Sequence, residues 1–482
     1  MSLVIILDCG ATNVRAIAVD LRGAIVASHY IANETIQNGT QHVWDYQQIW
    51  HKLVECCHKV TAQINARDIV AVSVTTFGVD GAPFDKNGQQ IYPIISWKCS
   101  RTATVMEQVA FELDRSALYQ ANGVGDYSFN TLFKLKWLKD NEPDIYQRMD
   151  KWVFISSMIT HQLTGRWTTD RTMAGTSMMT DLDTKDWHLS TLDYLGLNQD
   201  HFPPMIDAGD IVGWIVQEAA SLLGVPEHTP VVSAGHDTQF ALFGSGVLEN
   251  QPFLSSGTWE ILMARAPRPT LRAEYLRQGL TTELDAKNGL YNPAIQWLSS
   301  AVMEWVCNTL FSDIQRDESK YEVMIAEGSA APVGCNGTRF VPDFLLDAEN
   351  RGKGQLSGLS INTTRGEIYR AALEGLAFQL ADSLSTLADI SQFEADGLMV
   401  VGGGSKNVLW NQIRADVLGI PMCIVDQPES TVIGAAMYAF TGAGIYRDAE
   451  QAQQAMKPSF TVVRPTEQQA LYQPILQERR YA

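Results

Sequence analysis

The chain has 482 residues, which is too long for one ordinary domain and predicts two domains of roughly 200–250 residues each. Its composition, 45% hydrophobic and 19% charged, is typical of a soluble globular protein, and no apolar run approaches the ~20 residues that span a bilayer. The net charge of −18 argues against broad binding to nucleic acid or anionic membranes, because both require a basic surface. An anionic ligand such as a nucleotide would have to be neutralised locally, by backbone N–H groups and a metal ion.

The cysteines and the N-terminus indicate a reducing, intracellular setting. The seven cysteines are scattered and form no C-x-x-C pair, so they predict neither a disulfide framework nor a zinc site. The opening MSLVIILDCG has no basic region before its apolar run, and Asp8 interrupts that run, which favours a strand over a signal peptide. We therefore expect a cytoplasmic protein, and the sequence leaves open whether it is a homo-oligomer.

The first elements along the chain are predicted strands. LVIILD is followed by the small-residue turn CGATN and then by two strands that a turn at Gly23 separates. This differs from a dinucleotide-binding βαβ unit, in which the glycine turn leads into a helix. AVSVTT (71–76) predicts another buried strand, which ends in a loop carrying Asp80.

The turn at 8–13 has the residue types of a phosphate site. Gly10 lets the backbone approach a phosphate closely, Thr12 and Asn13 can donate hydrogen bonds, and Arg15 is a nearby cation. Asp8 offers hard oxygen ligands to Mg²⁺. Taken alone, the same turn is equally consistent with an ordinary β-hairpin.

A polar run lies inside the apolar stretch SAGHDTQFALFGSG (233–246). Phosphoryl transfer to an alcohol needs a carboxylate that accepts the hydroxyl proton, which Asp237 could provide, while His236 and Thr238 could bind a polyol. The alternatives are that Asp237 caps a helix beginning here and that His236 is a structural, hydrogen-bonded histidine.

The second half begins as the first does. PFLSSGTWEILMAR (252–265) predicts a strand, a small-residue turn with Gly257 and Thr258, and a second strand. Residues 366–388 have helical periodicity, with Thr364 as the expected N-cap, and residues 398–419 predict a strand, the glycine turn GGGS and a helix. Two α/β halves with similar turns suggest a ligand bound between them and a boundary near 244–252.

Two long patterns carry a family resemblance: FNTLFKLKWLKDN (129–141) and GQLSGLSINTTRGEIYRAALE (354–374). With the turns above and in the same order, they resemble the FGGY family of carbohydrate kinases, within the actin-like and hexokinase-like superfamily. The resemblance implies an α/β fold of two actin-like (ribonuclease H-like) domains with a ligand cleft between them. The expected domains are residues 1–245 (sugar site, first phosphate loop and catalytic aspartate), 246–445 (second phosphate loop and adenosine site) and a C-terminal extension, 446–482, packing on the second domain.

The resemblance also implies roles for individual residues. Asp237 corresponds to the catalytic base. Asp8 matches a position of the first phosphate loop, and we expect it to hold Mg²⁺, either directly or through water. The sugar-contacting positions are Gly78, Asp80, Gly81, His236, Asp237, Thr238 and Asn292. The ATP-contacting positions are Gly10, Ala11, Thr12, Asn13 and Arg15 in the first loop, Gly257 and Thr258 in the second, and Gly402, Gly403 and Gly404 in the adenosine turn.

The implied activity is ATP-dependent phosphorylation of a ketose at its primary hydroxyl, with ATP and Mg²⁺ required. L-Fuculose, giving L-fuculose 1-phosphate, is the expected substrate, and L-rhamnulose, D-ribulose and D-xylulose are the alternatives. The expected partners are thus a small sugar and ATP, not nucleic acid or membrane. Two other classes stay open: an actin-like ATPase without a sugar substrate, and a dinucleotide oxidoreductase, which rests on Gly402–Gly404 alone.

Overall fold

The computed structural model describes residues 2–344, 353–427 and 429–481. The chain forms two compact units, each assembled from three segments. The first unit contains Met1–Gly246, Pro267–Asn292 and Glu429–Pro458, and the second contains Val247–Ala266, Pro293–Pro428 and Ser459–Ala482.

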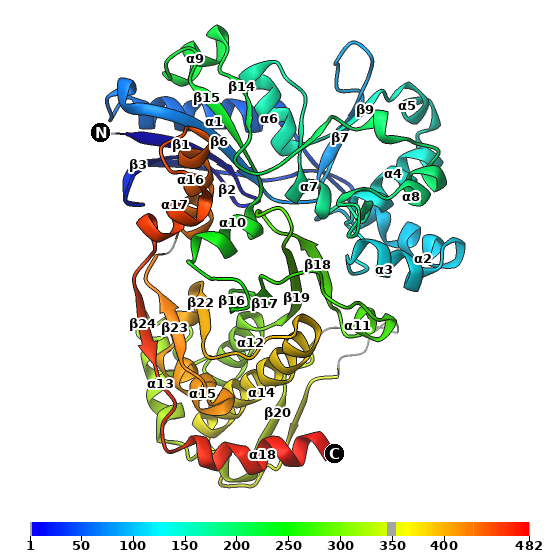
Figure 1. Ribbon diagram of the computed structural model, residues 1–482. Coiled ribbons are helices and arrows are strands. Elements are labelled where there is room, and N and C mark those ends of the chain that lie inside the picture. Colours follow the sequence, from blue (N-terminus) through cyan, green and yellow to red (C-terminus); the bar gives the residue numbers. More distant parts are fainter. Residues whose placement is uncertain (1, 345–352, 428, 482) are drawn as a thin grey trace. The chain divides into compact units, whose positions relative to one another are not determined.

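A six-stranded sheet forms the centre of the first unit (Figure 1). Its order is β14 (Ile211–Trp214), β15 (Pro230–His236), β6 (Ile69–Thr76), β1 (Leu3–Cys9), β2 (Asn13–Asp20) and β3 (Ile25–Ala32). β1 pairs antiparallel with β2 and parallel with β6, which in turn pairs parallel with β15. The predicted strand–turn–strand opening and the buried strand at 71–76 are thereby confirmed.

Helices cover both faces of this sheet, which explains why β1 is apolar throughout. Val4 and Ile6 belong to the core that includes α16 (Ser430–Gly442), whereas Ile5 and Leu7 belong to the core that includes α1 (Tyr46–Thr61). Successive side chains of a strand point to opposite faces, so a strand covered on both sides has no solvent-facing position.

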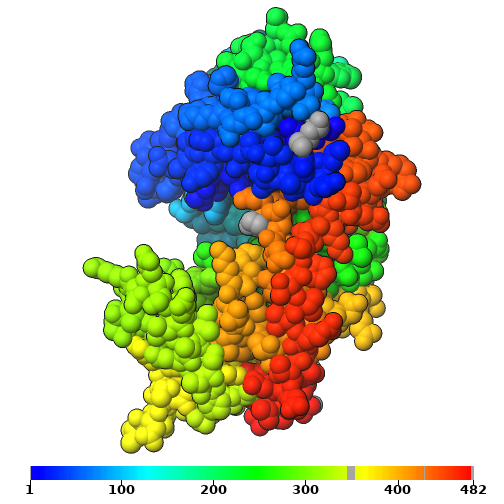
Figure 2. Space-filling view, turned by 90° about the vertical axis from the view of Figure 1, so that its left-hand side faces the viewer, coloured from blue at the N-terminus to red at the C-terminus, as the bar shows by residue number. Residues whose placement is uncertain are grey.

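The segment around α16 reaches the first unit from far along the chain. α16 crosses α10 (Asp237–Gly244) through two glycines: a Cβ at Gly244 would lie 2.0 Å from the Ser430 carbonyl oxygen, and one at Gly434 would lie 2.0 Å from that of Phe240. Figure 2 shows the orange-red residues of this segment against the blue N-terminal residues.

The compact units therefore differ from the linear boundaries expected from the sequence. Residues 267–292 and 429–458 pack with the first unit, so the first part of the expected C-terminal extension lies there. The physical reason is that α16 is apolar on all sides and is buried against β1, β6 and β15. Only the segment from Ser459 onward packs on the second unit, where β24 (Phe460–Val463) pairs with β23 (Met422–Val425).

The second unit repeats the strand arrangement of the first. The part of the seven-stranded sheet that belongs to this unit runs β19 (Tyr291–Leu298), β17 (Trp259–Ala264), β16 (Pro252–Ser256), β22 (Leu398–Val401), β23 and β24. β16 pairs antiparallel with β17 and parallel with β22, as β1 does with β2 and β6. The prediction that the two halves begin alike is confirmed.

The long helix of the second unit, α14 (Arg365–Ser391), begins where the sequence predicts. The Thr364 side chain accepts a hydrogen bond from the Glu367 backbone N–H, and the Glu367 carboxylate accepts one from the Thr364 backbone N–H. This reciprocal capping box satisfies two amide groups that a helix start otherwise leaves unpaired.

Shorter elements complete both units. The remaining helices of the first unit are α2 (Ala103–Glu112), α3 (Arg115–Asn122), α4 (Thr131–Asn141), α5 (Pro143–Arg148), α6 (Ile155–Thr164), α7 (Arg171–Gly175), α8 (Leu189–Leu195), α9 (Gln217–Leu223), α11 (Ala273–Arg277) and α17 (Ala449–Met456). Those of the second are α12 (Ser300–Leu310), α13 (Lys320–Ala330), α15 (Val408–Leu418) and α18 (Gln469–Tyr481). The short strands are β4 (Ile36–Asn38), β5 (Gln41–Trp44), β7 (Gly81–Phe84), β8 (Ile94–Ile95), β9 (Lys151–Phe154), β10 (Thr169–Asp170), β11 (Thr180–Asp181), β12 (Asp186–Trp187), β13 (Met205–Ile206), β18 (Thr281–Leu284), β20 (Arg339–Val341) and β21 (Gln355–Ser357). Within the described ranges, no helix is long and apolar enough to cross a membrane.

Candidate active site

The parallel strands of the first unit end at the same sheet edge. Cys9 at the end of β1 and His236 at the end of β15 both lie opposite Thr76 at the end of β6. The three chain segments that leave this edge are the turn after Asp8, the loop with Asp80, and α10 with Asp237. Ligands of α/β proteins commonly bind at the carboxyl ends of parallel strands.

Asp237 is the first residue of α10, and His236 occupies the N-cap position. The prediction that a helix begins here is confirmed. Asp237, however, lies in the first turn of the helix and is not its N-cap residue. Its Oδ1 accepts a hydrogen bond from the Thr238 backbone N–H at 2.7 Å, and 31% of its surface stays exposed. Within the described residues nothing donates to Oδ2, which can therefore accept a proton from a ligand.

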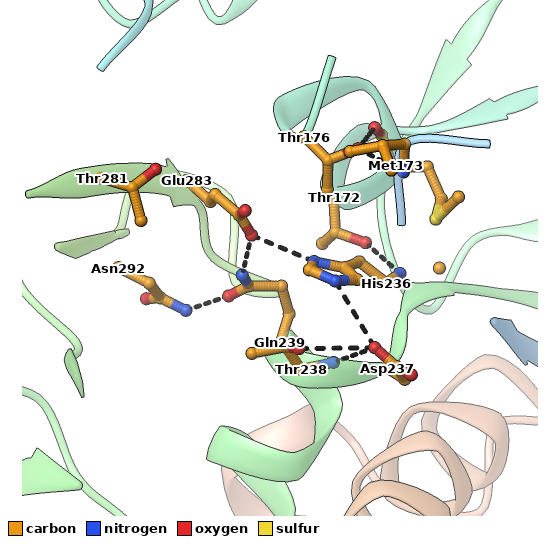
Figure 3. A network of polar contacts seen from close by, with 12 residues as sticks. Thr172, Met173, Thr176, His236, Asp237, Thr238, Gln239, Thr281, Glu283 and Asn292 are labelled. Atoms are coloured by element: carbon orange, nitrogen blue, oxygen red, sulfur yellow. Dashed lines mark hydrogen bonds and ion pairs between the residues drawn. The ribbon is translucent and has the colours of Figure 1, made fainter. Parts of the chain in front are cut away.

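His236 lies between two carboxylates (Figure 3). Its Nδ1 is 3.0 Å from Glu283 Oε2, and its Nε2 is 3.4 Å from Asp237 Oδ1. Burial disfavours the charged imidazole, but Glu283 and then Asp237 outweigh it and raise the pKa of His236. Loss of surrounding water raises the pKa of Asp237, and His236 opposes that rise.

The same network reaches Asn292. Gln239 donates from Nε2 to Glu283 Oε2 at 2.6 Å, and Asn292 donates from Nδ2 to Gln239 Oε1. Asn292 is only 1% exposed, and its Oδ1 is buried without a hydrogen-bond partner among the described residues. Of the predicted sugar contacts, His236 and Thr238 therefore lie beside Asp237. Asn292 lies at the other end of the network, joined to His236 through Gln239 and Glu283, and it presents one unsatisfied acceptor.

The first phosphate turn is held by backbone contacts. Gly10 donates from N to the Asn13 carbonyl at 2.9 Å, and a Cβ at Gly10 would lie 2.9 Å from that same oxygen. Asn33 braces the turn through hydrogen bonds to the carbonyls of Gly10 and Thr12. Thr12 is exposed, and the nearby Lys98, an exposed cation not identified from the sequence, donates to the Ala11 carbonyl.

Asp8 and Arg15 form an ion pair beside this turn. Arg15 Nε donates to Asp8 Oδ2 at 2.8 Å, and Arg15 Nη1 donates to Glu429 Oε2 at 2.6 Å. Burial raises the pKa of Asp8 to about 6 although Arg15 opposes the shift. The predicted phosphate cation is thus held by two carboxylates, one of them 414 residues away in the sequence.

The predicted sugar loop is packed tightly against its surroundings. A Cβ atom at Gly78 would lie 3.0 Å from the His236 ring, and one at Gly81 would lie 2.6 Å from the Val153 carbonyl oxygen. Asp80 is fully buried, and its carboxylate accepts hydrogen bonds from Trp44 Nε1, the Trp97 backbone N–H and Lys134 Nζ. In this arrangement Asp80 holds the loop, and its oxygens are engaged by protein donors.

The two predicted turns of the second unit lie at one edge of its sheet, because β16 and β22 pair in parallel with Ser255 opposite Val401. A buried polar cluster fixes them: Glu260 accepts from Ser256 Oγ, from Trp297 Nε1 and from Arg414. Gly257 and Gly403 are accessible, and Thr258 is exposed. The turns at 255–258 and 402–405 are therefore held by the same buried cluster within this unit.

Gly404 is predicted to be essential for the shape of the adenosine turn. A Cβ there would lie 2.1 Å from Ser256 Oγ and 3.2 Å from the Trp410 ring, so the Gly404→Ala variant must displace the turn. Overpacking of this kind costs about 1–3 kcal/mol. We expect the KM for ATP to rise about tenfold with a smaller change for the sugar, measured by coupled ADP release.

The matched control is Gly403→Ala, because nothing lies within 4 Å of a Cβ built at Gly403. Its KM for ATP is expected to stay close to that of the parent protein. Equal effects of the two substitutions would show that the turn does not have to fit against Ser256.

Four supporting residues were not identified from the sequence as site residues. Glu283 and Gln239 hold His236 and Asn292, Glu429 holds Arg15, and Lys134 holds Asp80. Lys134 lies in a quoted pattern, but a lysine in a helical pattern carries no sign of a partner 54 residues away. Gln239 lies in the polar run at 236–239 but was given no role, and Glu283 and Glu429 gave no local signal.

Both halves of the chain match family models. Residues 3–244 match the N-terminal domain of the FGGY family of carbohydrate kinases, and residues 253–443 match its C-terminal domain. An L-fuculokinase of Haemophilus influenzae is 53% identical over 467 residues, covering 95% of this chain and 98% of that protein. An L-fuculokinase of Escherichia coli K12 is 46% identical over 455 residues, covering 93% and 94%.

Solved structures agree on the fold. The crystal structure of xylulose kinase from Rhodospirillum rubrum superposes with a TM-score of 0.91, at 22% identity, over 99% of this chain and 98% of that one. The predicted two-domain α/β kinase fold is confirmed. The chain belongs to the FGGY family of carbohydrate kinases, whose members transfer phosphate from ATP to a sugar.

Proposed function

We propose that this protein is an ATP-dependent L-fuculokinase that converts L-fuculose to L-fuculose 1-phosphate. The relatives named L-fuculokinase are 45–53% identical across nearly the whole chain, whereas a rhamnulokinase of Oceanobacillus iheyensis is 25% identical. The single structural observation that supports the chemistry is the environment of Asp237. Its carboxylate follows the carboxyl end of strand β15, is partly exposed, and has an Oδ2 that accepts no hydrogen bond from the described residues.

In this proposal Asp237 is the general base. The O1 hydroxyl of the ketose gives its proton to Asp237 as its oxygen attacks the γ-phosphorus of ATP, a new O–P bond forms, and the bond to the ADP oxygen breaks. His236, Thr238 and Asn292 orient the sugar hydroxyls around that carboxylate. The unpartnered Oδ1 of Asn292 supplies an acceptor that a sugar hydroxyl would satisfy.

The turns would hold the nucleotide. In the first unit, residues 11–13 would offer backbone N–H groups and hydroxyl or amide donors to phosphate oxygens, with Gly10 closing the turn and Arg15 as the cation beside it. In the second unit, Gly257 and Thr258 would contact phosphate and Gly402–Gly404 the adenosine.

Asp8 fits the role of a Mg²⁺ contact. Among the described residues, no group of three or more His, Cys, Asp or Glu could hold a metal. Mg²⁺ in kinases is commonly held by one or two carboxylates together with substrate phosphates and water, and Asp8 provides such a carboxylate beside the phosphate turn. The metal would neutralise charge on the phosphate oxygens.

A substrate panel tests the proposal. ADP release is measured with L-fuculose, L-rhamnulose, D-ribulose, L-ribulose and D-xylulose at equal concentration and fixed ATP. We expect the highest kcat/KM with L-fuculose, because a misplaced hydroxyl leaves buried polar groups of the site unpaired. A higher kcat/KM for another ketose would overturn the substrate, and ATP hydrolysis unaffected by every sugar would overturn the kinase assignment.

A further inference from the structure

A partly buried carboxylate that no sequence pattern pointed to lies on the other side of His236 from the proposed catalytic aspartate. Glu283 is on β18, 47 residues from His236 in the chain, and its side chain is 18% exposed. Oε2 accepts hydrogen bonds from His236 Nδ1 and Gln239 Nε2. Figure 3 shows Glu283, His236 and Asp237 in one connected series.

The hydrogen bond to Glu283 determines which ring nitrogen of His236 carries a proton. An ionised carboxylate can only accept hydrogen bonds, so the 3.0 Å contact requires a proton on Nδ1 of His236. Burial on its own would raise the pKa of Glu283, but His236 and Gln239 together lower it, which keeps this carboxylate ionised. With Nδ1 committed to Glu283, Nε2 is the ring nitrogen that faces Asp237, at 3.4 Å.

We propose that Glu283 is a positioning residue of the active site: it holds the His236 ring with Nδ1 toward itself and Nε2 toward the catalytic carboxylate of Asp237, and it favours the positively charged form of the ring. Gln239 links the same carboxylate to Asn292, so one residue supports both sides of the sugar site. This inference rests on the proposed function.

The charges around the pair determine the direction of the expected effect. His236 faces Glu283 on β18, Asp237 on α10 and Asp170 before α7, while Asp237 faces His236, Glu283 and, from β1, Asp8. Removing the charge of Glu283 removes the largest influence that raises the pKa of His236, and so favours the neutral ring. Less positive charge beside Asp237 then raises the pKa of that carboxylate.

Glu283 also acts on Asp237 directly, and in the opposite sense. The negative charge of Glu283 raises the pKa of Asp237, although less strongly than His236 lowers it. If His236 kept its proton in a Glu283→Gln variant, the pKa of Asp237 would fall. The two possibilities therefore predict shifts of opposite sign.

The pH dependence of kcat/KM for L-fuculose measures this difference. In Glu283→Gln we expect the acidic limb to move to higher pH by about 1 unit, the effect of losing one opposite charge within about 4–6 Å. Glu283→Asp keeps the charge and should move the limb less. The control is Glu274→Gln, which removes an exposed carboxylate from α11 of the same chain segment and should leave the profile unchanged.

The state of His236 is followed directly by NMR, because Asp8 can also titrate in this pH range. The imidazole resonance, assigned by its loss in His236→Gln, is expected to titrate above pH 6.5 in the parent protein. It should titrate lower in Glu283→Gln. The parent measurement tests the proposal even if the variant does not fold.

An acidic limb that stays in place or moves to lower pH, or a His236 that titrates below its ordinary value in the parent protein, would overturn the role of Glu283. The outcome is separable from the proposed function. If Asp237→Asn loses activity while the pH profile of Glu283→Gln stays in place, only the positioning role of Glu283 is refuted. If the Asp237→Asn protein is active, the role of Asp237 as the general base is refuted.

Discussion

The Asp237→Asn variant is expected to lose about 10²–10⁴-fold in kcat for sugar phosphorylation, the contribution of a general base. An amide of the same shape can keep the hydrogen bond from the Thr238 N–H to its oxygen, so α10 and the surrounding fold should be preserved. The amide cannot accept the hydroxyl proton. Single-turnover ADP release with saturating L-fuculose measures the loss.

Binding separates this result from misfolding. Because Asp237 is not among the residues assigned to the nucleotide, the Kd for ATP, measured by calorimetry, should change less than threefold, well under the ~1.4 kcal/mol of a tenfold change. Near-normal turnover by a folded Asp237→Asn protein would mean that another group accepts the proton. A large loss of ATP affinity would instead place Asp237 at the nucleotide.

The elements that local patterns specify were predicted well. β1, with apolar residues at every position, and α14, with its Thr364–Glu367 capping box, depend only on neighbours in the sequence. The similarity of the openings of the two halves was visible because a strand, a small-residue turn and a second strand recur with the same order of residue types.

What could not be predicted depends on contacts between distant residues. Glu283 occurs in TTEL, a stretch with no motif, and only the fold brings it to His236. The position of α16 in the first unit follows from its close glycine crossing with α10, almost 200 residues earlier in the chain. The alternative role of Asp237 as a helix cap was close to the observed geometry, since the residue begins α10 while His236 is at the N-cap.

Lys134 provides the second large expected effect, on stability. Its ammonium and Asp80 are both fully buried, and Lys134 also donates to the Val79 carbonyl at 3.1 Å. Val79 has φ of 62°, a strained backbone conformation for a β-branched residue, so this hydrogen bond helps to hold a costly loop geometry. Burial raises the pKa of Asp80 and lowers that of Lys134, which means that each charge depends on the other.

We expect Lys134→Met to lower the free energy of unfolding by about 3–5 kcal/mol at pH 7.5, because it leaves a buried carboxylate without its counter-charge. Protonation relieves that charge, so the deficit relative to the parent protein should shrink as the pH falls through the raised pKa of Asp80. Adding Asp80→Asn should recover part of the loss at pH 7.5.

Urea denaturation followed by tryptophan fluorescence measures the free energy of unfolding of the parent, the single variant and the double variant. The control is Lys59→Met, which breaks an exposed ion pair with Glu55 and should cost only about 0.2–0.5 kcal/mol. A Lys134→Met deficit as small as that of Lys59→Met, or one that grows as the pH falls, would show that the buried pair does not stabilise the sugar loop.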